Sequence, residues 1–507
     1  MLLRESYIYH LWAVLCGVYY DSTLHRCLAA AGSWCNRQID TSALLRVLCR
    51  EGVVARAWED SFLCRLLSGI INFPAWLLHR LYSALQLTFA DSFFSRLAFA
   101  MGDETAIAQS WLIMLLWVIP FSRWNNAYTL MAFAFLLVLF HAGAMHTRSF
   151  RLDVRSIGFY PLVLFGSMFL AVAFSYAPSL SLRFLVYHIS AALCVLVTVS
   201  AVRYTEDLKR LVAGGGFCVL VSSLYGVYQR IQGVEVNESY VDLTVNEGMP
   251  GRVESFFDNP NTFAEVLILL LPLVLALILC SHRPLSRLVA CGVFAVGIVA
   301  LGMTYSRASW VGMACAMVVM VFLWKPKLIP AFVVLSILCV PFLPDTIWHR
   351  ILTITNTSDS STASRIPLYE AAIEVIRKSP ISGAGLGTAA TQAYISDFNL
   401  YHAQAPFVHA HNFFLEVWIE AGLLGIVGFV SAMLWNIKKT AHTVRHCRPS
   451  AARTITCGAC AAMCGAMVCG LADYLWNYPI VMCIFWFVFA VGSAGIKLCR
   501  QEMKDRT

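Results

Sequence analysis

The chain has 507 residues, of which 59% are hydrophobic and 13% charged, and its mean hydropathy is +0.69. A soluble domain carries roughly 25% charged residues, so this composition excludes a string of soluble domains and predicts one polytopic membrane protein. The formal net charge of +8 does not indicate nucleic-acid binding, because Lys and Arg in membrane proteins gather in cytoplasmic loops.

Residues 1–105 differ from the rest of the chain. Their apolar pieces, such as 62–67 and 70–78, are interrupted every few residues by Arg, His or Asp. No piece reaches the roughly 20 apolar residues that a spanning helix needs. We therefore predict an N-terminal region of amphipathic helices, in the cytoplasm or on the membrane surface. One spanning or re-entrant segment near 66–87 stays open.

Residues 106–507 form the predicted membrane body, an all-α fold of about twelve transmembrane helices. A large extracytoplasmic loop with short helices belongs to it. The candidate spans are 106–122, 126–144, 157–177, 182–202, 209–228, 262–281, 287–305, 308–324, 328–344, 412–436, 455–475 and 478–498.

Lys and Arg are distributed unequally between the two sides of this predicted topology. Six basic segments, beginning with 146–155 and ending with the C-terminal tail, fall on one side, whereas the opposite short loops carry single arginines. The positive-inside rule then places both termini in the cytoplasm. It places the two long polar loops, 229–261 and 345–411, outside.

The first polar constellation on the outer side precedes the span 262–281. Asn259-Pro260-Asn261 is a helix-start signal, and a capped helix entry is its plain interpretation. A helix N-terminus also attracts anions, and Arg252 beside it would strengthen an anion site. Glu265, one turn into the span, is costly in lipid and is expected to face a cavity or a partner.

A second constellation, Tyr305-Ser306-Arg307, lies where two spans meet with almost no loop between them. Arg307 could snorkel to the membrane surface. The planar fork of Arg also suits phosphate, so a phosphate- or sugar-facing role is the alternative. Asp473, in the last outer loop, is a further carboxylate at the membrane boundary that needs a partner.

The long loop 345–411 carries the remaining candidates. Residues 364–377 predict an amphipathic helix in which Arg365 occupies the first turn, where the helix dipole disfavours a cation and an anionic partner would relieve the misfit. Gly383-x-Gly385-x-Gly387 lacks a following Lys-Ser/Thr, so we predict a tight turn rather than a nucleotide-binding loop.

His411, at the point where the chain re-enters the membrane, is suited to act as a general base near neutral pH. Glu416 and Glu420 follow it and could orient its ring. His409-x-His411 could instead bind a metal, but no third ligand is evident in the sequence, and we predict no metal site.

Together these motifs resemble the O-antigen ligase/polymerase family of bacterial membrane glycosyltransferases, over roughly residues 210–440. Each motif is weak alone, and their order and spacing carry the resemblance. The family usually has Ser-Arg-Gly where this chain has Ser306-Arg307-Ala308. The other matching pieces are Gly251-Arg252, Phe257-x-Asn259-Pro260-Asn261, Ser364-Arg365, the Gly383 turn, His411-Asn412 and Glu420-x-Gly422-x-x-Gly425.

The resemblance implies an enzyme of the bacterial cytoplasmic membrane whose site faces outward. Its donor would be a glycan linked to a polyprenyl diphosphate such as undecaprenyl diphosphate. The acceptor would be a hydroxyl of a glycan, lipid or protein, and other polysaccharide-assembly proteins would be partners. No metal, nucleotide sugar or other cofactor would be required.

Carried over by motif, Arg307 and Arg365 would bind the diphosphate and His411 would activate the acceptor. Arg252, Asn259 and Asn261 would support them. Glu265, Tyr305, Ser306 and Asp473 join the expected substrate-binding set on their positions. Ligase and polymerase activities are not separated by this sequence. A flippase for lipid-linked oligosaccharide or polysaccharide is the alternative function, and it predicts charges through the middle of several spans and no large outer loop.

Overall fold

The computed structural model describes residues 7–50, 52–89, 92–125, 127–146, 150–237, 250–352, 363–403 and 406–505. These residues form helices and turns without a β-strand, and ten of the helices are long and apolar enough to cross a membrane. The predicted all-α polytopic class is confirmed. Parts of both long polar loops, 238–249 and 353–362, lie outside the described residues.

Nine of the twelve predicted spans coincide with long apolar helices. Each is 18 residues or longer, enough to cross most or all of a bilayer core. They are α9 (Ala127–His146), α12 (Pro178–Ala201), α13 (Thr205–Gln232), α14 (Pro260–Cys280), α15 (Pro284–Met303), α16 (Arg307–Trp324), α22 (Phe413–His446), α23 (Ala451–Cys469) and α24 (Pro479–Lys504).

The other three predicted spans are shorter or bent. α8 (Thr105–Leu116) and α11 (Phe159–Ala173) have 12 and 15 residues. α17 (Ile329–Cys339) continues through a 3-10 turn into α18 (Asp345–Leu352) with a bend of 116°. Prolines at positions 341 and 344 lie at this bend, and a proline cannot donate the backbone hydrogen bond that would continue the helix.

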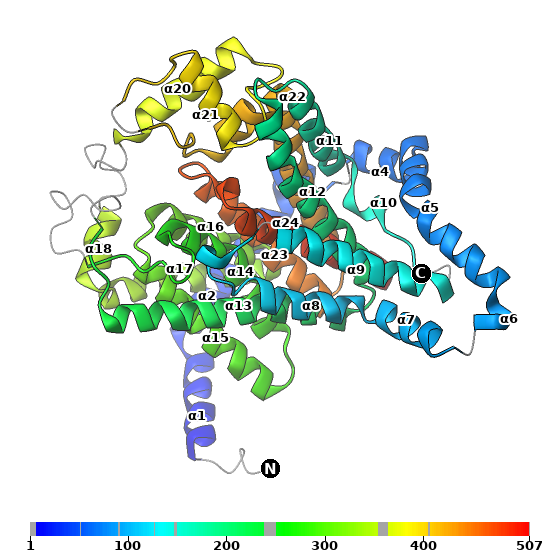
Figure 1. Ribbon diagram of the computed structural model, residues 1–507. Helices are drawn as coiled ribbons and strands as arrows, with labels where there is room; N and C mark the ends of the chain where they lie inside the picture. The colour runs from blue at the N-terminus through cyan, green and yellow to red at the C-terminus, as the bar shows by residue number, and fades with distance from the viewer. Residues whose placement is uncertain are drawn as a thin grey trace.

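The N-terminal region folds as seven helices that lie against different parts of the body. α2 packs against α17, whereas α5 and α7 pack against α9, and Figure 1 shows the two groups apart. α5 meets the length and hydropathy of a membrane span, in the region where the sequence left one span open. The helices are α1 (Tyr7–Asp21), α2 (Thr23–Thr41), α3 (Ala43–Leu48), α4 (Val53–Asp60), α5 (Phe62–Ala84), α6 (Gln86–Phe89) and α7 (Phe93–Asp103).

α24 forms the centre of the body, with α12, α14 and α23 packed around it. Small residues allow a close contact between α16 and α23, because a Cβ atom added at Gly465 would lie 2.6 Å from the carbonyl oxygen of Gly312. Close approach at small residues is a usual way for membrane helices to associate. This contact brings the N-terminus of α16 near the turn that follows α23.

The predicted outer loop, 345–411, folds over its described residues as a small helical layer with its own apolar cluster, in which Leu368, Ala372, Tyr394 and Phe407 are buried. α20 (Arg365–Lys378) confirms the predicted amphipathic helix, and α21 (Thr388–Asp397) follows it. Both lie over the upper end of α22 in Figure 1. The three glycines of the turn between them have positive φ, and Gly385 packs so tightly that a Cβ would collide with Ser175.

Candidate active site

A cavity of about 570 Å³ opens where the helical layer meets the ends of α14, α16 and α22. Widely separated segments contribute its lining, which includes both the outer loop and the turn between α23 and α24. Nine of the ten residues predicted for the site line it: Arg252, Asn259, Asn261, Tyr305, Ser306, Arg307, Arg365, His411 and Asp473.

Glu265 is the predicted residue that lies outside the lining. It is 3% exposed on α14, close enough to Asp473 to interact with it electrostatically. Among the lining residues that were not assigned to the site are two with basic side chains, Arg350 and His409. Arg350 stands in the same loop as Arg365, and its position in the last turn of the short amphipathic helix α18 was the signal that could have suggested it.

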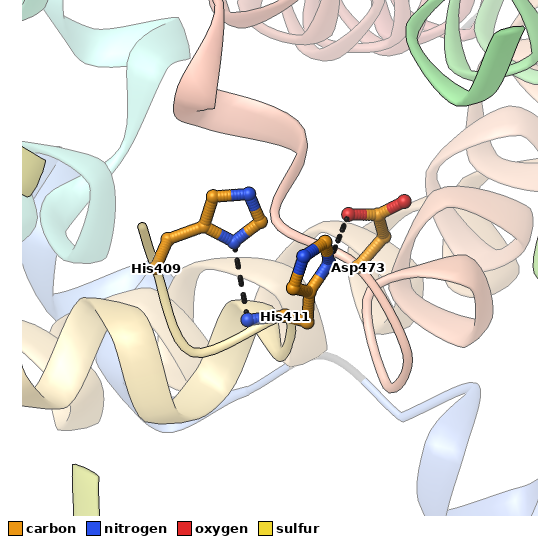
Figure 2. Close-up of side chains that lie close together, drawn as sticks. All are labelled: His409, His411 and Asp473. Carbon is orange, nitrogen blue, oxygen red and sulfur yellow. Dashed lines mark hydrogen bonds and ion pairs between the residues drawn. The ribbon is translucent and has the colours of Figure 1, made fainter. Parts of the chain in front are cut away.

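His411 and Asp473 form the central contact of the cavity (Figure 2). The imidazole Nδ1 lies 3.2 Å from Oδ1 of Asp473. An ionised carboxylate can only accept a hydrogen bond. Nδ1 of His411 therefore carries the hydrogen atom and donates a hydrogen bond to Asp473. This tautomer leaves Nε2 of His411 as the proton acceptor, which is the arrangement of an oriented general base.

The backbone of His411 is held in an uncommon conformation, with φ of +45°. Its N–H donates to Nδ1 of His409 over 3.1 Å, as Figure 2 shows. One residue earlier, the N–H of Ala410 donates to the Glu416 carboxylate over 2.6 Å. A non-glycine residue at positive φ persists where its surroundings hold it, and such residues cluster at functional sites.

Asp473 is fixed by its own neighbours. The backbone N–H of Tyr474 donates to Oδ1 of Asp473, and the Tyr474 hydroxyl donates to Glu420 over 3.0 Å. Burial alone would raise the pKa of Asp473, yet the hydrogen bond from His411 and the positive charge of Arg365 hold this pKa below its usual value. Glu416 and Glu420 therefore contact the segments that carry His411 and Asp473, rather than the His411 ring.

Arg252 is anchored at the back of the cavity. Its Nε donates to the carbonyl oxygen of Thr304 over 2.7 Å, and its Nη2 donates to the side-chain oxygen of Asn261. The predicted capped entry of α14 is present, but the cap is Asn259 rather than Asn261 or Thr262, because the Asn259 side chain accepts from the backbone N–H groups of both. These bonds join the start of α14 to the turn before α16.

That turn also bends sharply. Tyr305 has φ of +51°, and its hydroxyl accepts from Nη2 of Arg230 over 3.3 Å. Arg307, which begins α16, and Ser306 before it follow directly and line the cavity. The uncommon backbone conformation of Tyr305 thus turns the chain from α15 into α16. The polar residues that follow it therefore lie in the cavity lining.

Four arginines, at positions 252, 307, 350 and 365, line the cavity, whereas Asp473 supplies the one carboxylate among the described lining residues. Arg252 and Arg350 are 9% and 4% exposed. Clustered guanidinium groups form a site for an anion with several oxygens, such as a diphosphate. The cavity thus contains one arginine more than the predicted site, which had Arg252, Arg307 and Arg365.

His409, His411 and Asp473 also satisfy the distances of a metal site, since one ligand atom from each lies within 4.8 Å of the others. Asp473 would be the third ligand of such a site, which the sequence did not reveal. The same three groups, however, make the hydrogen bonds of an oriented base, and Arg365 adds positive charge beside them. These neighbours favour proton transfer over cation binding.

The buried His409 makes stability depend on pH. Burial, with the nearby charges of His411 and Arg365, lowers the pKa of His409 from 6.5 to about 3. Between these values the unfolded chain binds a proton that the folded chain does not, so stability falls as the pH drops, by about 1.4 kcal/mol per pH unit. We expect His409→Asn to lose this acid sensitivity, worth about 2 kcal/mol near pH 5.

Thermal unfolding in detergent at about pH 7 and about pH 5 measures this difference. The control is His402→Asn, because His402 lies in the same loop and is exposed. A His409→Asn protein with the same pH dependence as the wild type would contradict the assigned cause.

Comparison with known proteins bears on this same region. Residues 292–430 match the O-antigen ligase family. The matched segment contains Arg307, Arg350, Arg365 and His411, whereas Arg252 and Asp473 reach the cavity from outside it. No curated protein matches the chain. The part of the chain that resembles the O-antigen ligase family is thus residues 292–430.

Proposed function

We propose that this membrane protein transfers a glycan from a polyprenyl-diphosphate carrier to an acceptor hydroxyl at the outer face of the bacterial cytoplasmic membrane. The observation that carries the proposal is the meeting of four arginines with an oriented His411–Asp473 pair in one cavity. The family match supports a glycan-transferring enzyme. The proposal adds to this match a polyprenyl-diphosphate donor, a hydroxyl acceptor and a site that faces outward.

The chemistry follows from the lining. The acceptor hydroxyl gives its proton to Nε2 of His411 as its oxygen attacks the anomeric carbon of the donor sugar. The bond from that carbon to the diphosphate oxygen breaks, and the bonding electrons leave with the diphosphate. Arg307 and Arg365 face the negative charge that develops there, and preorganised donors of this kind have large leverage on a transition state. Asp473 stabilises the imidazolium that forms on His411.

The outward orientation of this site is supported by the distribution of Lys and Arg. The ends of the helices opposite to the cavity carry the basic segments, including Lys438-Lys439 on α22 and Lys497 to Lys504 on α24. Both termini are then cytoplasmic. Reporter fusions at the two termini and in the loop after α21 test this orientation, and a loop reporter active in the cytoplasm would contradict it.

A flippase is the alternative function. It would expose polar residues along a path through the membrane, whereas the four arginines and Asp473 gather in one cavity at one end of the body. An enzyme needs an acceptor base with a defined tautomer, which a transporter does not. The hydrogen bond from His411 to Asp473 therefore favours transfer over transport.

The decisive experiment is a transfer assay with the purified protein in nanodiscs. The donor is an oligosaccharide on undecaprenyl diphosphate, offered with a second copy of the donor or with a separate glycan acceptor. We expect product and free undecaprenyl diphosphate to form together, and activity to persist with a chelator. Absence of both products with every acceptor sinks the proposed function, and loss of activity on chelation, restored by a divalent metal, sinks its metal-independent form.

A further inference from the structure

A second and larger cavity, of about 1200 Å³, lies between α5 and the body. Its walls come from α5, the end of α9, the segment 150–155, the end of α12 and the end of α24. The residues on these walls are distinct from those of the candidate active site. The loops that contribute belong to the basic, predicted cytoplasmic side of the membrane.

Polar contacts join α5 to the neighbouring segments at this cavity. Asn72 exchanges two hydrogen bonds with the backbone of Leu152, over 3.0 and 2.7 Å. Further along, Nδ1 of His79 lies 3.1 Å from the carbonyl oxygen of Met145. At the helix preceding α5, Glu59 accepts from Arg155 and Arg500. Along its length α5 therefore contacts residues that all lie at the same end of the neighbouring helices. This arrangement is expected for a helix lying along the membrane surface.

The cavity attracts anions. Five cationic side chains line it, against two carboxylates, those of Glu59 and Asp153. Glu59 pairs with Arg155, and Asp153 lies 3.9 Å from Lys497, so the carboxylates are already engaged. Arg65 and Arg151 form no ion pair with a carboxylate of the described residues. The five cations are Arg65, Arg151, Arg155, Arg203 and Lys497.

An apolar wall continues from this charged part. Phe73, Trp76 and Phe150 line the same cavity, and only 11% of the apolar stretch of α5 is buried inside the protein. The rest of α5 is thus left for lipid to cover. A phosphate among arginines beside an apolar, lipid-facing helix is the chemistry of a phospholipid, and basic pockets on the cytoplasmic side of membrane proteins hold such headgroups.

We propose that this cavity binds the headgroup phosphate of an anionic phospholipid of the cytoplasmic leaflet, with the acyl chains along α5. Bound lipid would join the N-terminal helices to α9 and α24. The proposal concerns a site on the opposite side of the protein from the proposed glycan transfer, and does not depend on that function.

Native mass spectrometry of the purified protein, with phosphatidylglycerol or phosphatidylcholine added, tests the proposal. We expect wild-type protein to retain phosphatidylglycerol preferentially. Arg65→Glu with Arg151→Glu should weaken this retention about tenfold or more. The matched control is Arg283→Glu with Arg448→Glu, two exposed arginines on the same predicted side that do not line the cavity. Equal retention by the cavity variant and the control overturns the proposal.

A second variant tests the space rather than the charge. Gly69 lines the cavity, and a Cβ added there would meet nothing within 4 Å, so Gly69→Trp should fill the cavity without disturbing α5. Gly292→Trp on α15, equally open, is its control. We expect Gly69→Trp to lose the bound lipid. Retention by Gly69→Trp, or binding of inorganic phosphate as tight as that of phosphatidylglycerol, overturns the assignment to a lipid.

Discussion

His411→Ala is expected to lower the rate of glycan transfer by roughly a hundred- to ten-thousand-fold, the usual contribution of a positioned general base. The loss should fall on kcat, because the arginines that bind the donor diphosphate remain in place. Single-turnover assays with the undecaprenyl-diphosphate donor separate this loss from donor binding. The protein should still insert and unfold at a similar temperature, since His411 is partly exposed.

The Asp473→Asn variant tests whether His411 acts as a general base or has only a structural role. An amide in place of the carboxylate can donate to Nδ1, which favours the wrong tautomer of His411 and removes the charge that stabilises the imidazolium. We expect a large loss of kcat and an altered pH profile of transfer. His402→Ala, an exposed histidine of the same loop, should leave transfer unchanged. If His411→Ala keeps wild-type activity, the role assigned to this residue is wrong.

Removing either proposed diphosphate ligand should have an effect of similar size. Arg307→Ala and Arg365→Ala are each expected to lower kcat/KM by about a hundred- to a thousandfold, as for other donors aimed at developing charge. Lysine at either position keeps the charge but loses the planar fork, so we expect partial recovery. The double variant should lose less than the product of the single losses, because both arginines act on one leaving group.

Arg377→Ala is the control for these variants. Arg377 lies on the same helix as Arg365, but its exposed side chain pairs with Glu374 instead of lining the cavity. It should transfer glycan at the wild-type rate. Donor binding measured with a non-transferable diphosphate analogue gives an independent readout. Unchanged binding and transfer in both Arg307→Ala and Arg365→Ala would contradict the diphosphate site.

Most of the polar residues in the cavity lining could be predicted because polar residues at a membrane boundary are costly and therefore conspicuous in an apolar chain. Arg252, Arg307 and Arg365 were found in this way, whereas the cap of α14 was expected at Asn261 or Thr262 and is formed by Asn259. Arg350 was not assigned to the site, because its helix follows a bend that a prediction of straight spans does not include. The break at Pro341 and Pro344 moves α18 toward the other arginines.

The partner of His411 was predicted among its sequence neighbours, Glu416 and Glu420. In the structure the partner is Asp473, 62 residues later, and the two glutamates hold the backbone of Ala410 and the hydroxyl of Tyr474. Helical spacing places Glu416 near the start of α22, but the turn after α23 comes beside His411 only when α22 and α23 are packed together.

The sequence by itself determined the membrane class, nine of the spans, the helix in the outer loop and which charged residues stand at span boundaries. These follow from hydropathy and local spacing, which act within one segment. Tertiary structure alone decided the His411–Asp473 hydrogen bond, the gathering of four arginines and the cavity beneath α5. Each depends on how distant helices pack, because close approach at residues such as Gly312 and Gly465 sets which helix ends meet.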